Sequence, residues 1–232
     1  MSVLKCRWGG VSVSTEKAYN IYHDYANVKE SSHLSLSRHA LQYLYMKRVI
    51  DIIIAGVGLV LSLPVILLFA LLIVLETPGS PFYFQERVGK SGKTFKIIKL
   101  RSMRMDAEKE GARWAAKQDS RVTRIGAFIR KTRIDELPQL LLVLKGDMSI
   151  VGPRPERPVF VKQFNQEIDG FEKRLLVKPG LTGLAQVNGG YDITPKEKLK
   201  YDLEYIRNLA FKHEMKIIIK TIKVLFTGEG AR

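Results

Sequence analysis

The longest apolar stretch of the chain covers residues 52–75 and contains no charged side chain. About 20 apolar residues in a helix cross the ~30 Å hydrocarbon core of a bilayer, so this stretch is long enough to be a membrane helix. Pro64 lies near its middle, where it removes a backbone donor and presses its ring against the carbonyl of Val60. The two halves, residues 52–63 and 64–75, would each be roughly 18 Å long as helices, too short to span a bilayer alone. The pattern predicts either a kinked spanning helix or a helix that enters the membrane and returns.

Polar residues mark the ends and the middle of this stretch. Arg48 and Asp51 lie on one face of a helix, and we expect the two side chains to pair near the membrane interface. Ser62 shortly precedes Pro64, so its hydroxyl can bond a backbone carbonyl that the proline frees. Residues 77–81 read Thr-Pro-Gly-Ser-Pro, which is typical of a turn and ends the membrane element.

Outside this stretch the pattern is one of short segments. Residues 1–46 have no sustained period and predict a loose extension that becomes helical from about Leu34. Residues 82–84 are expected to form a short strand or an interfacial anchor. Helical patterns cover residues 105–117, 123–133, 160–176, 194–205 and 212–226. Residues 177–190 are rich in glycine, and such a long loop in a compact domain is more often functional than filler.

The charge of the chain favours re-entry over spanning. The formal net charge is +15, with +4 in residues 1–48 and +12 in residues 76–232. Cytoplasmic flanks of membrane helices are enriched in Lys and Arg, and a returning helix leaves both basic flanks in the cytoplasm. The single cysteine, Cys6, excludes a disulfide framework and fits a reducing compartment. Basic segments at 95–103 and 212–226 suit anionic lipid, a phosphorylated substrate or, for the last helix, packing on the domain core.

Two adjacent carboxylates, Asp135 and Glu136, follow a run of cations at Arg130, Lys131 and Arg133. A carboxylate among cations has a depressed pKa and stays ionised, as a nucleophile or a metal ligand must. The alternative is a solvated helix start, where acidic residues are common.

A stiff backbone is expected around Arg154, which stands between Pro153 and Pro155. Because proline fixes φ on both sides, the guanidinium is preorganised, and its fork suits bidentate binding of phosphate oxygens. The alternative is a turn at the domain edge whose arginine pairs with a local carboxylate.

Seven motifs occur in an order that is specific to one family. They are Lys-Arg-Val-Ile-Asp at 47–51, Gln-Glu-Arg-Val-Gly at 85–89, Phe-Lys-Ile-Ile-Lys-Leu-Arg-Ser-Met at 95–103, Asp-Glu-Leu-Pro-Gln-Leu at 135–140, Lys-Gly-Asp-Met-Ser at 145–149, Val-Gly-Pro-Arg-Pro at 151–155 and Lys-Pro-Gly-Leu-Thr-Gly at 178–183. Over residues 46–226 the chain resembles the small monotopic phosphoglycosyl transferases. These bacterial sugar transferases start exopolysaccharide, capsule and glycan assembly on polyprenyl (undecaprenyl) phosphate.

The resemblance implies a fold of the α+β class, mainly helical, with amphipathic interfacial helices and short strands. Its expected parts are an N-terminal cytoplasmic extension (1–46), a re-entrant membrane helix (47–76) and a catalytic domain (77–232) on the cytoplasmic face of the bacterial inner membrane. The family bends its helix at a Ser-Pro pair, whereas one residue separates Ser62 from Pro64 here.

The resemblance also implies that Asp135 is the nucleophile and Glu136 its partner in a Mg²⁺-dependent site, where Glu136 binds the metal or accepts a proton. Arg101, Arg130 and Arg154 would neutralise the diphosphate of a UDP-sugar. Asp135 would expel UMP and keep the phosphosugar, which undecaprenyl phosphate would then take up. No motif fixes the sugar, and a homodimer would fit the family.

Two other functions fit parts of the pattern. A basic module attached to membrane lipids could bind anionic lipid or nucleic acid, but this does not explain an acidic pair inside a cationic cluster, so we expect no nucleic acid partner. A membrane-associated phosphohydrolase could use the same acidic pair, and would release UMP without a lipid acceptor.

Overall fold

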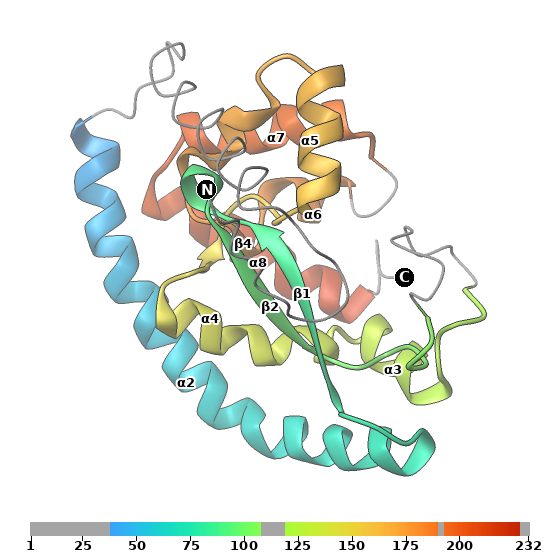
Figure 1. The fold of residues 1–232 in the computed structure, drawn as a ribbon. Coiled ribbons are helices and arrows are strands. Elements are labelled where there is room, and N and C mark those ends of the chain that lie inside the picture. Colours follow the sequence, from blue (N-terminus) through green and yellow to red (C-terminus); the bar gives the residue numbers. More distant parts are fainter. Residues whose placement is uncertain (1–37, 108–118, 190–192, 228–232) are drawn as a thin grey trace, which may run out of the picture.

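The computed structural model describes residues 38–107, 119–189 and 193–227. The fold is α+β and mainly helical, as predicted (Figure 1). Its helices are α2 (Arg38–Glu76), α3 (Arg124–Lys131), α4 (Leu140–Lys145), α5 (Pro158–Glu167), α6 (Leu184–Gly189), α7 (Pro195–Arg207) and α8 (Phe211–Thr227). Short 3₁₀ turns are η1 (Lys90–Gly92), η2 (Ile134–Gln139) and η3 (Phe171–Leu176), and the strands are β1 (Phe82–Val88), β2 (Thr94–Leu100), β3 (Ser149–Val151) and β4 (Gly180–Thr182).

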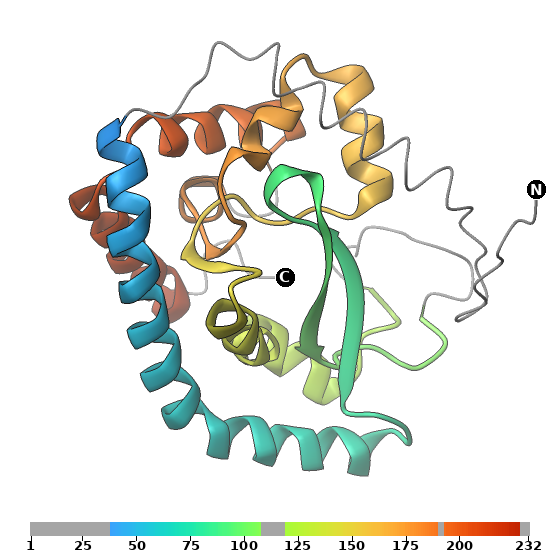
Figure 2. The ribbon, with the colours of Figure 1, turned by 60° about the vertical axis from the view of Figure 1, so that its left-hand side comes forward.

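Helix α2 is bent, and the rest of the described chain lies on its concave side (Figures 1 and 2). Its blue first part and its teal second part run in different directions, and Pro64 is inside the helix with its ring exposed. Residues Gln42–Glu76 are long enough and apolar enough to cross a membrane. The convex side exposes large apolar side chains along its length, including Ile53, Val60, Leu67, Leu71 and Leu75. The length and this outer face are those of a membrane helix.

The predicted pairing of Arg48 with Asp51 is wrong. Arg48 instead donates hydrogen bonds to the carbonyls of Val143 (2.5 Å) and Leu144 (2.7 Å), at the end of α4. Free carbonyls and a partial negative charge at a helix C-terminus attract a cation, which explains why Arg48 bonds the end of α4. Asp51 accepts a hydrogen bond from the Ser149 hydroxyl at 2.7 Å. Both side chains therefore fasten the first half of α2 to the domain.

The hydroxyl of Ser62 bonds a different carbonyl from the one that Pro64 frees. It donates to the carbonyl of Leu59 at 3.3 Å, whereas the carbonyl four residues before Pro64 belongs to Val60. A hydroxyl bonded back to its own helix favours bending, so Ser62 still acts in the same direction as the proline.

The second half of α2 packs on β2 and α3. Ile66 and Ile73 form a buried cluster with Leu100 of β2 and Ile129 of α3. The ring of Phe69 stacks on that of Phe128, with centroids 5.6 Å apart. At the end of the helix, Glu76 accepts hydrogen bonds from the first amides of α3, those of Arg124 (2.8 Å) and Ile125 (3.2 Å). Both halves of α2 are thus bound to one domain.

The strands form two separate two-stranded sheets. β1 and β2 are antiparallel, with Phe82 opposite Leu100 and Val88 opposite Thr94, so the strand expected at 82–84 is longer than predicted. β3 and β4 are parallel, and β4 lies within residues 177–190, as does α6. The prediction of a loop over 177–190 is therefore wrong.

Close backbone contact, rather than loop flexibility, explains Gly180 and Gly183 in this segment. The amide of Gly152 donates to the carbonyl of Thr182 at 2.9 Å. A Cβ on Gly180 would lie 2.1 Å from the Gly152 nitrogen, and one on Gly183 would lie 2.2 Å from the Gly152 oxygen. Only glycine, which has no Cβ, lets the two backbone segments approach this closely.

The predicted helices over 123–133, 194–205 and 212–226 are confirmed by α3, α7 and α8. Thr194 and Glu197 form a capping box at the start of α7. The single helix expected over 160–176 is wrong, because Gly170 adopts φ 74° and separates α5 from η3. The helix expected over 105–117 and the extension over 1–46 fall mostly outside the described residues.

Candidate active site

Asp135 and Glu136 lie in η2, which follows α3 after a sharp reversal. Thr123 caps α3 by accepting a hydrogen bond from the Gly126 amide at 2.9 Å. Arg133 makes the reversal with φ 58° and ψ 17°, a left-handed conformation that is uncommon for a residue with a side chain. Both carboxylates are buried, each with 7% of its surface exposed.

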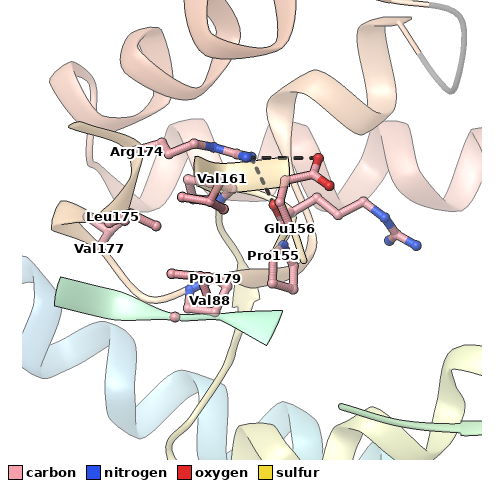
Figure 3. Close-up of a pocket in the computed structure, with 11 residues that line it drawn as sticks. Val88, Pro155, Glu156, Val161, Arg174, Leu175, Val177 and Pro179 are labelled. Carbon is pink, nitrogen blue, oxygen red and sulfur yellow. Dashed lines mark hydrogen bonds and ion pairs between the residues drawn. The ribbon is translucent and has the colours of Figure 1, made fainter. Parts of the chain in front are cut away.

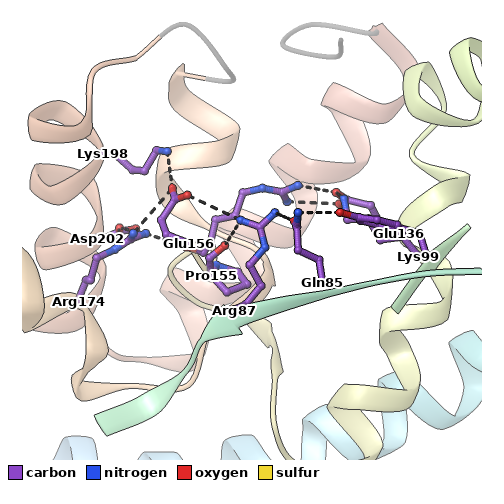
Figure 4. A network of polar contacts seen from close by, with 11 residues as sticks. Gln85, Arg87, Lys99, Glu136, Pro155, Glu156, Arg174, Lys198 and Asp202 are labelled. Carbon is purple, nitrogen blue, oxygen red and sulfur yellow. Dashed lines mark hydrogen bonds and ion pairs between the residues drawn. The ribbon is translucent and has the colours of Figure 1, made fainter. Parts of the chain in front are cut away.

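Glu136 is held by two cations from different parts of the chain. Lys99 of β2 donates to its Oε1 at 2.6 Å. Arg154 donates to the same oxygen at 2.5 Å and to Oε2 at 3.4 Å. Figure 4 shows Lys99 and Glu136 together at the end of a longer polar network. The fork of Arg154 therefore faces the acidic pair, as an arginine that binds phosphate beside this pair would.

Asp135 has a different environment from its neighbour. Its carboxylate pairs with Lys99 at 3.6 Å. Burial raises the pKa of Asp135 above its ordinary value, and the cation of Lys99 only partly opposes this. Burial would also raise the pKa of Glu136, but the charges of Arg154 and Lys99 hold it well below its ordinary value. The predicted depressed pKa is correct for Glu136 and wrong for Asp135, because the nearest cations bond Glu136.

The three arginines expected to bind phosphate have different positions. Arg154 lies in the cluster, and the charge of Arg130 at the end of α3 partly opposes the rise that burial causes in the pKa of Asp135. Arg101 is buried elsewhere and donates to the carbonyls of Thr77 (2.7 Å) and Pro78 (2.9 Å). Its guanidinium secures the turn after α2, where carbonyls of the helix end need donors.

Lys99 is the member of the cluster that sequence reasoning did not single out. It was one of three cations in residues 95–103, with no distinction among them. In β2, Lys99 is half-buried whereas Lys96 is exposed. The alternation of the strand does not distinguish the two lysines, because Ile97 on the face of Lys99 and Leu100 on the face of Lys96 are both buried.

A second ionic cluster, around Glu156, lies at the other end of the polar network from Glu136 (Figure 4). Glu156 pairs with Lys198 at 2.7 Å and lies 3.9 Å from Arg174, which also pairs with Asp202 at 2.7 Å. Arg87 of β1 lies 4.0 Å from Glu156. This rear cluster (Arg87, Glu156, Arg174, Lys198 and Asp202) joins β1, the loop after β3, η3 and α7.

Asp135 and Glu136 could hold a magnesium ion if water and the substrate supplied its remaining ligands. Within the described ranges, no three His, Cys, Asp or Glu side chains gather as metal ligands. Mg²⁺, however, is usually held by one or two carboxylates together with waters and substrate phosphates. Asp135 and Glu136 fit this requirement, and a cation beside Asp135 would favour its ionised form.

Several known proteins of similar sequence are named as undecaprenyl-phosphate sugar phosphate transferases. The family model of the bacterial sugar transferases matches residues 42–228. The chain is 60% identical over 163 residues, covering 70% of this chain and 90% of the relative, to the "Putative undecaprenyl-phosphate N-acetylgalactosaminyl 1-phosphate transferase" of Bacillus subtilis (strain 168).

Two further relatives are longer than this chain. The UDP-N-acetylgalactosamine-undecaprenyl-phosphate N-acetylgalactosaminephosphotransferase of Aeromonas hydrophila is 46% identical, over 82% of this chain and 46% of its own length. The UDP-glucose:undecaprenyl-phosphate glucose-1-phosphate transferase of Escherichia coli (strain K12) is 40% identical, over 80% of this chain and 41% of its own length. The chain thus spans less than half of these two relatives.

Proposed function

The chain belongs to the bacterial sugar transferase family, and we propose that it transfers a sugar 1-phosphate from a UDP-sugar to undecaprenyl phosphate. The products would be undecaprenyl-diphosphosugar and UMP, at the start of exopolysaccharide or related glycan synthesis. The observation that carries this proposal is the buried acidic pair, which faces Lys99 and Arg154 beside a membrane helix.

Asp135 is the nucleophile in this proposal. Its carboxylate oxygen attacks the phosphorus that bears the sugar, and the bond from that phosphorus to UMP breaks. An oxygen of undecaprenyl phosphate then attacks the same phosphorus, and the bond to Asp135 breaks. The carboxylate is regenerated unchanged. A covalent intermediate suits a reaction whose two substrates come from different phases, because they need not meet at one moment.

Glu136 orients the cations rather than accepting a proton. Its pKa, held far below the ordinary value by Arg154 and Lys99, makes it a poor base at neutral pH. Arg154 would bind diphosphate oxygens with the part of its fork that faces away from Glu136, and Arg130 would add charge from α3. Mg²⁺, held by Asp135 and Glu136 with the diphosphate, would neutralise the charge of the donor when bound.

We propose that α2 enters the cytoplasmic leaflet of the inner membrane and returns to it. The ends of α2 support this, because both bind the same domain. Lys47 bonds Glu214 of α8 at 2.8 Å, and Glu76 bonds the first amides of α3. In a spanning helix these ends would be separated by the ~30 Å hydrocarbon core. The bend near Pro64 and the apolar convex side agree with re-entry (Figure 2).

Replacing the nucleophile tests the proposal directly. The full chain, in detergent or nanodiscs, is given undecaprenyl phosphate, Mg²⁺ and a panel of UDP-sugars, and UMP release is measured. We expect one or more donors to react, EDTA to abolish the reaction, and Asp135→Asn to lower the rate by at least about 1,000-fold. Asp106→Asn is the control, since Asp106 is exposed and pairs only loosely with Arg104 at 3.9 Å.

Undiminished UMP release by Asp135→Asn would refute the nucleophile. Repeated turnover without the lipid acceptor would identify hydrolysis instead of transfer, because the proposed first step releases only one UMP per enzyme when no acceptor is present.

A further inference from the structure

We infer that Arg174 is a positioning residue, which fixes the backbone of Arg154 so that its guanidinium meets the donor diphosphate. The inference rests on the proposed function, in which Arg154 binds that diphosphate. Arg174 belongs to η3 and to the rear cluster, and it lies at the other end of the polar network from Glu136 (Figure 4).

Three successive backbone carbonyls, those of residues 153 to 155, each accept a hydrogen bond. The Gly180 amide donates to the carbonyl of Pro153 at 2.9 Å. Arg174 Nη2 donates to the carbonyl of Arg154 itself at 2.8 Å, and Arg87 Nη1 donates to that of Pro155 at 3.3 Å. Two of the three donors are charged, and such hydrogen bonds are the stronger kind. With φ of both prolines fixed, little freedom remains in this loop.

Arg174 is itself held in one orientation. It is 3% exposed, its Nε donates to Asp202 Oδ2 at 2.9 Å, and its guanidinium lies 4.9 Å from the centre of the Phe171 ring. A buried ion pair is often no more stabilising than well-packed apolar residues of the same volume. A gain in stability is therefore a weak reason to bury this arginine, whereas fixing a neighbouring group is a sufficient one.

The loop around Arg154 also borders a small, open pocket. Val88 of β1, Pro155 and Arg174 are among the residues that line it (Figure 3). The hydrogen bonds to its three carbonyls hold the loop in place beside this opening. Arg174 supplies the bond nearest to the side chain that acts.

A lysine at position 174 separates positioning from folding. Arg174→Lys keeps the charge and can still pair with Asp202, but it lacks the fork that bonds Asp202 and the Arg154 carbonyl together. Lys198→Gln is the matched control, since Lys198 enters the same cluster through the carboxylate of Glu156. Both variants remove part of one ionic cluster, so a general loss of stability should affect them alike.

The experiment measures UMP release by the full chain against UDP-sugar concentration, together with thermal unfolding. We expect Arg174→Lys to lower kcat/KM by about 10-fold or more, mainly through a higher KM for the donor, because misplacement of a binding group is costly. We expect the kcat/KM of Lys198→Gln to stay within about 2-fold of that of the unchanged protein. The midpoints of thermal unfolding of the two variants should fall by similar amounts. Equal losses of activity in the two variants would overturn the inference.

A double-mutant cycle gives the second readout. If Arg174 acts through Arg154, then Arg174→Lys should have little further effect on KM in an Arg154→Lys background. If the increases in KM of the two single variants multiplied in the double variant, the inference would be overturned. Failure of the proposed function is distinct, since the unchanged protein would then release no UMP from any UDP-sugar.

Discussion

Asp135 and Glu136 are adjacent in sequence, yet the structure gives them opposite electrostatic environments. Glu136 receives the forked arginine and the closer lysine contact, while Asp135 is left with burial and one lysine at 3.6 Å. In the proposed reaction only ionised Asp135 attacks. A carboxyl whose pKa is raised stays protonated to a higher pH, so the activity should fall on the acid side earlier than for an ordinary aspartate.

We therefore predict that kcat/KM falls as the pH decreases through the raised pKa of Asp135, above the ordinary value of about 3.9. Lys99→Gln removes the cation that opposes the shift, so it should move this acid limb to higher pH. Lys96→Gln, at an exposed position of β2, is the control and should leave the limb in place. A pH profile of UMP release checks both. An acid limb at the same pH in all three proteins would contradict the assignment.

At the same scale, the sequence indicated which polar side chains lie together better than it indicated the partners of the others. Asp135, Glu136 and Arg154 could be singled out because adjacent carboxylates and flanking prolines are visible in the sequence, and the structure places the three together. The pairing of Arg48 and the position of Arg101 were not found. Both arginines bond backbone carbonyls that are distant in sequence, at the end of α4 and after α2. No periodicity encodes such contacts.

Among the elements, the pair β3–β4 depends most on one residue type. Gly180→Ala would place a Cβ 2.1 Å from the Gly152 nitrogen, where only backbone movement can make room. We expect it to lower the free energy of unfolding by about 1–3 kcal/mol and to lower activity, since Gly180 also bonds the loop of Arg154. Thermal and denaturant unfolding in detergent check the first effect, and UMP release checks the second.

Gly56→Ala is the matched control for this prediction. A Cβ on Gly56 meets nothing within 4 Å, so the substitution should be neutral or slightly stabilising in the helix. If Gly180→Ala were as mild as Gly56→Ala, the close approach of β3 and β4 would not matter to the protein.

The elements also show where sequence patterns are sufficient. α3 and α8 were predicted because each has an amphipathic period, and α7 because Pro195 stands in its first turn. The segment at 177–190 was mistaken for a loop, since glycines that allow close backbone contact look the same in sequence as glycines that allow flexibility. Only the partner strand distinguishes the two cases.

For the whole molecule, the docking of both ends of α2 on one domain leads to a prediction about topology. Single cysteines are placed at Tyr45 and at Ser80, both exposed, after Cys6 is replaced by serine. We expect a membrane-impermeant maleimide to label both in inverted inner-membrane vesicles and neither in intact spheroplasts. Leu67→Cys, on the convex side, should be protected in both preparations. Labelling of the two flanks from opposite sides would require a spanning helix.

Glu76 constrains the length of the membrane element. This carboxylate ends α2 and also receives the first amides of α3, at Arg124 and Ile125. One residue inserted into the second half of α2 would turn Glu76 by about 100° and move it ~1.5 Å along the axis, away from those amides. Since η2 follows α3 closely, the acidic pair would be displaced with them. The number of residues in the second half of α2 therefore sets the position of the acidic pair relative to the membrane helix. We expect this number to be constrained as the side chains of the site are.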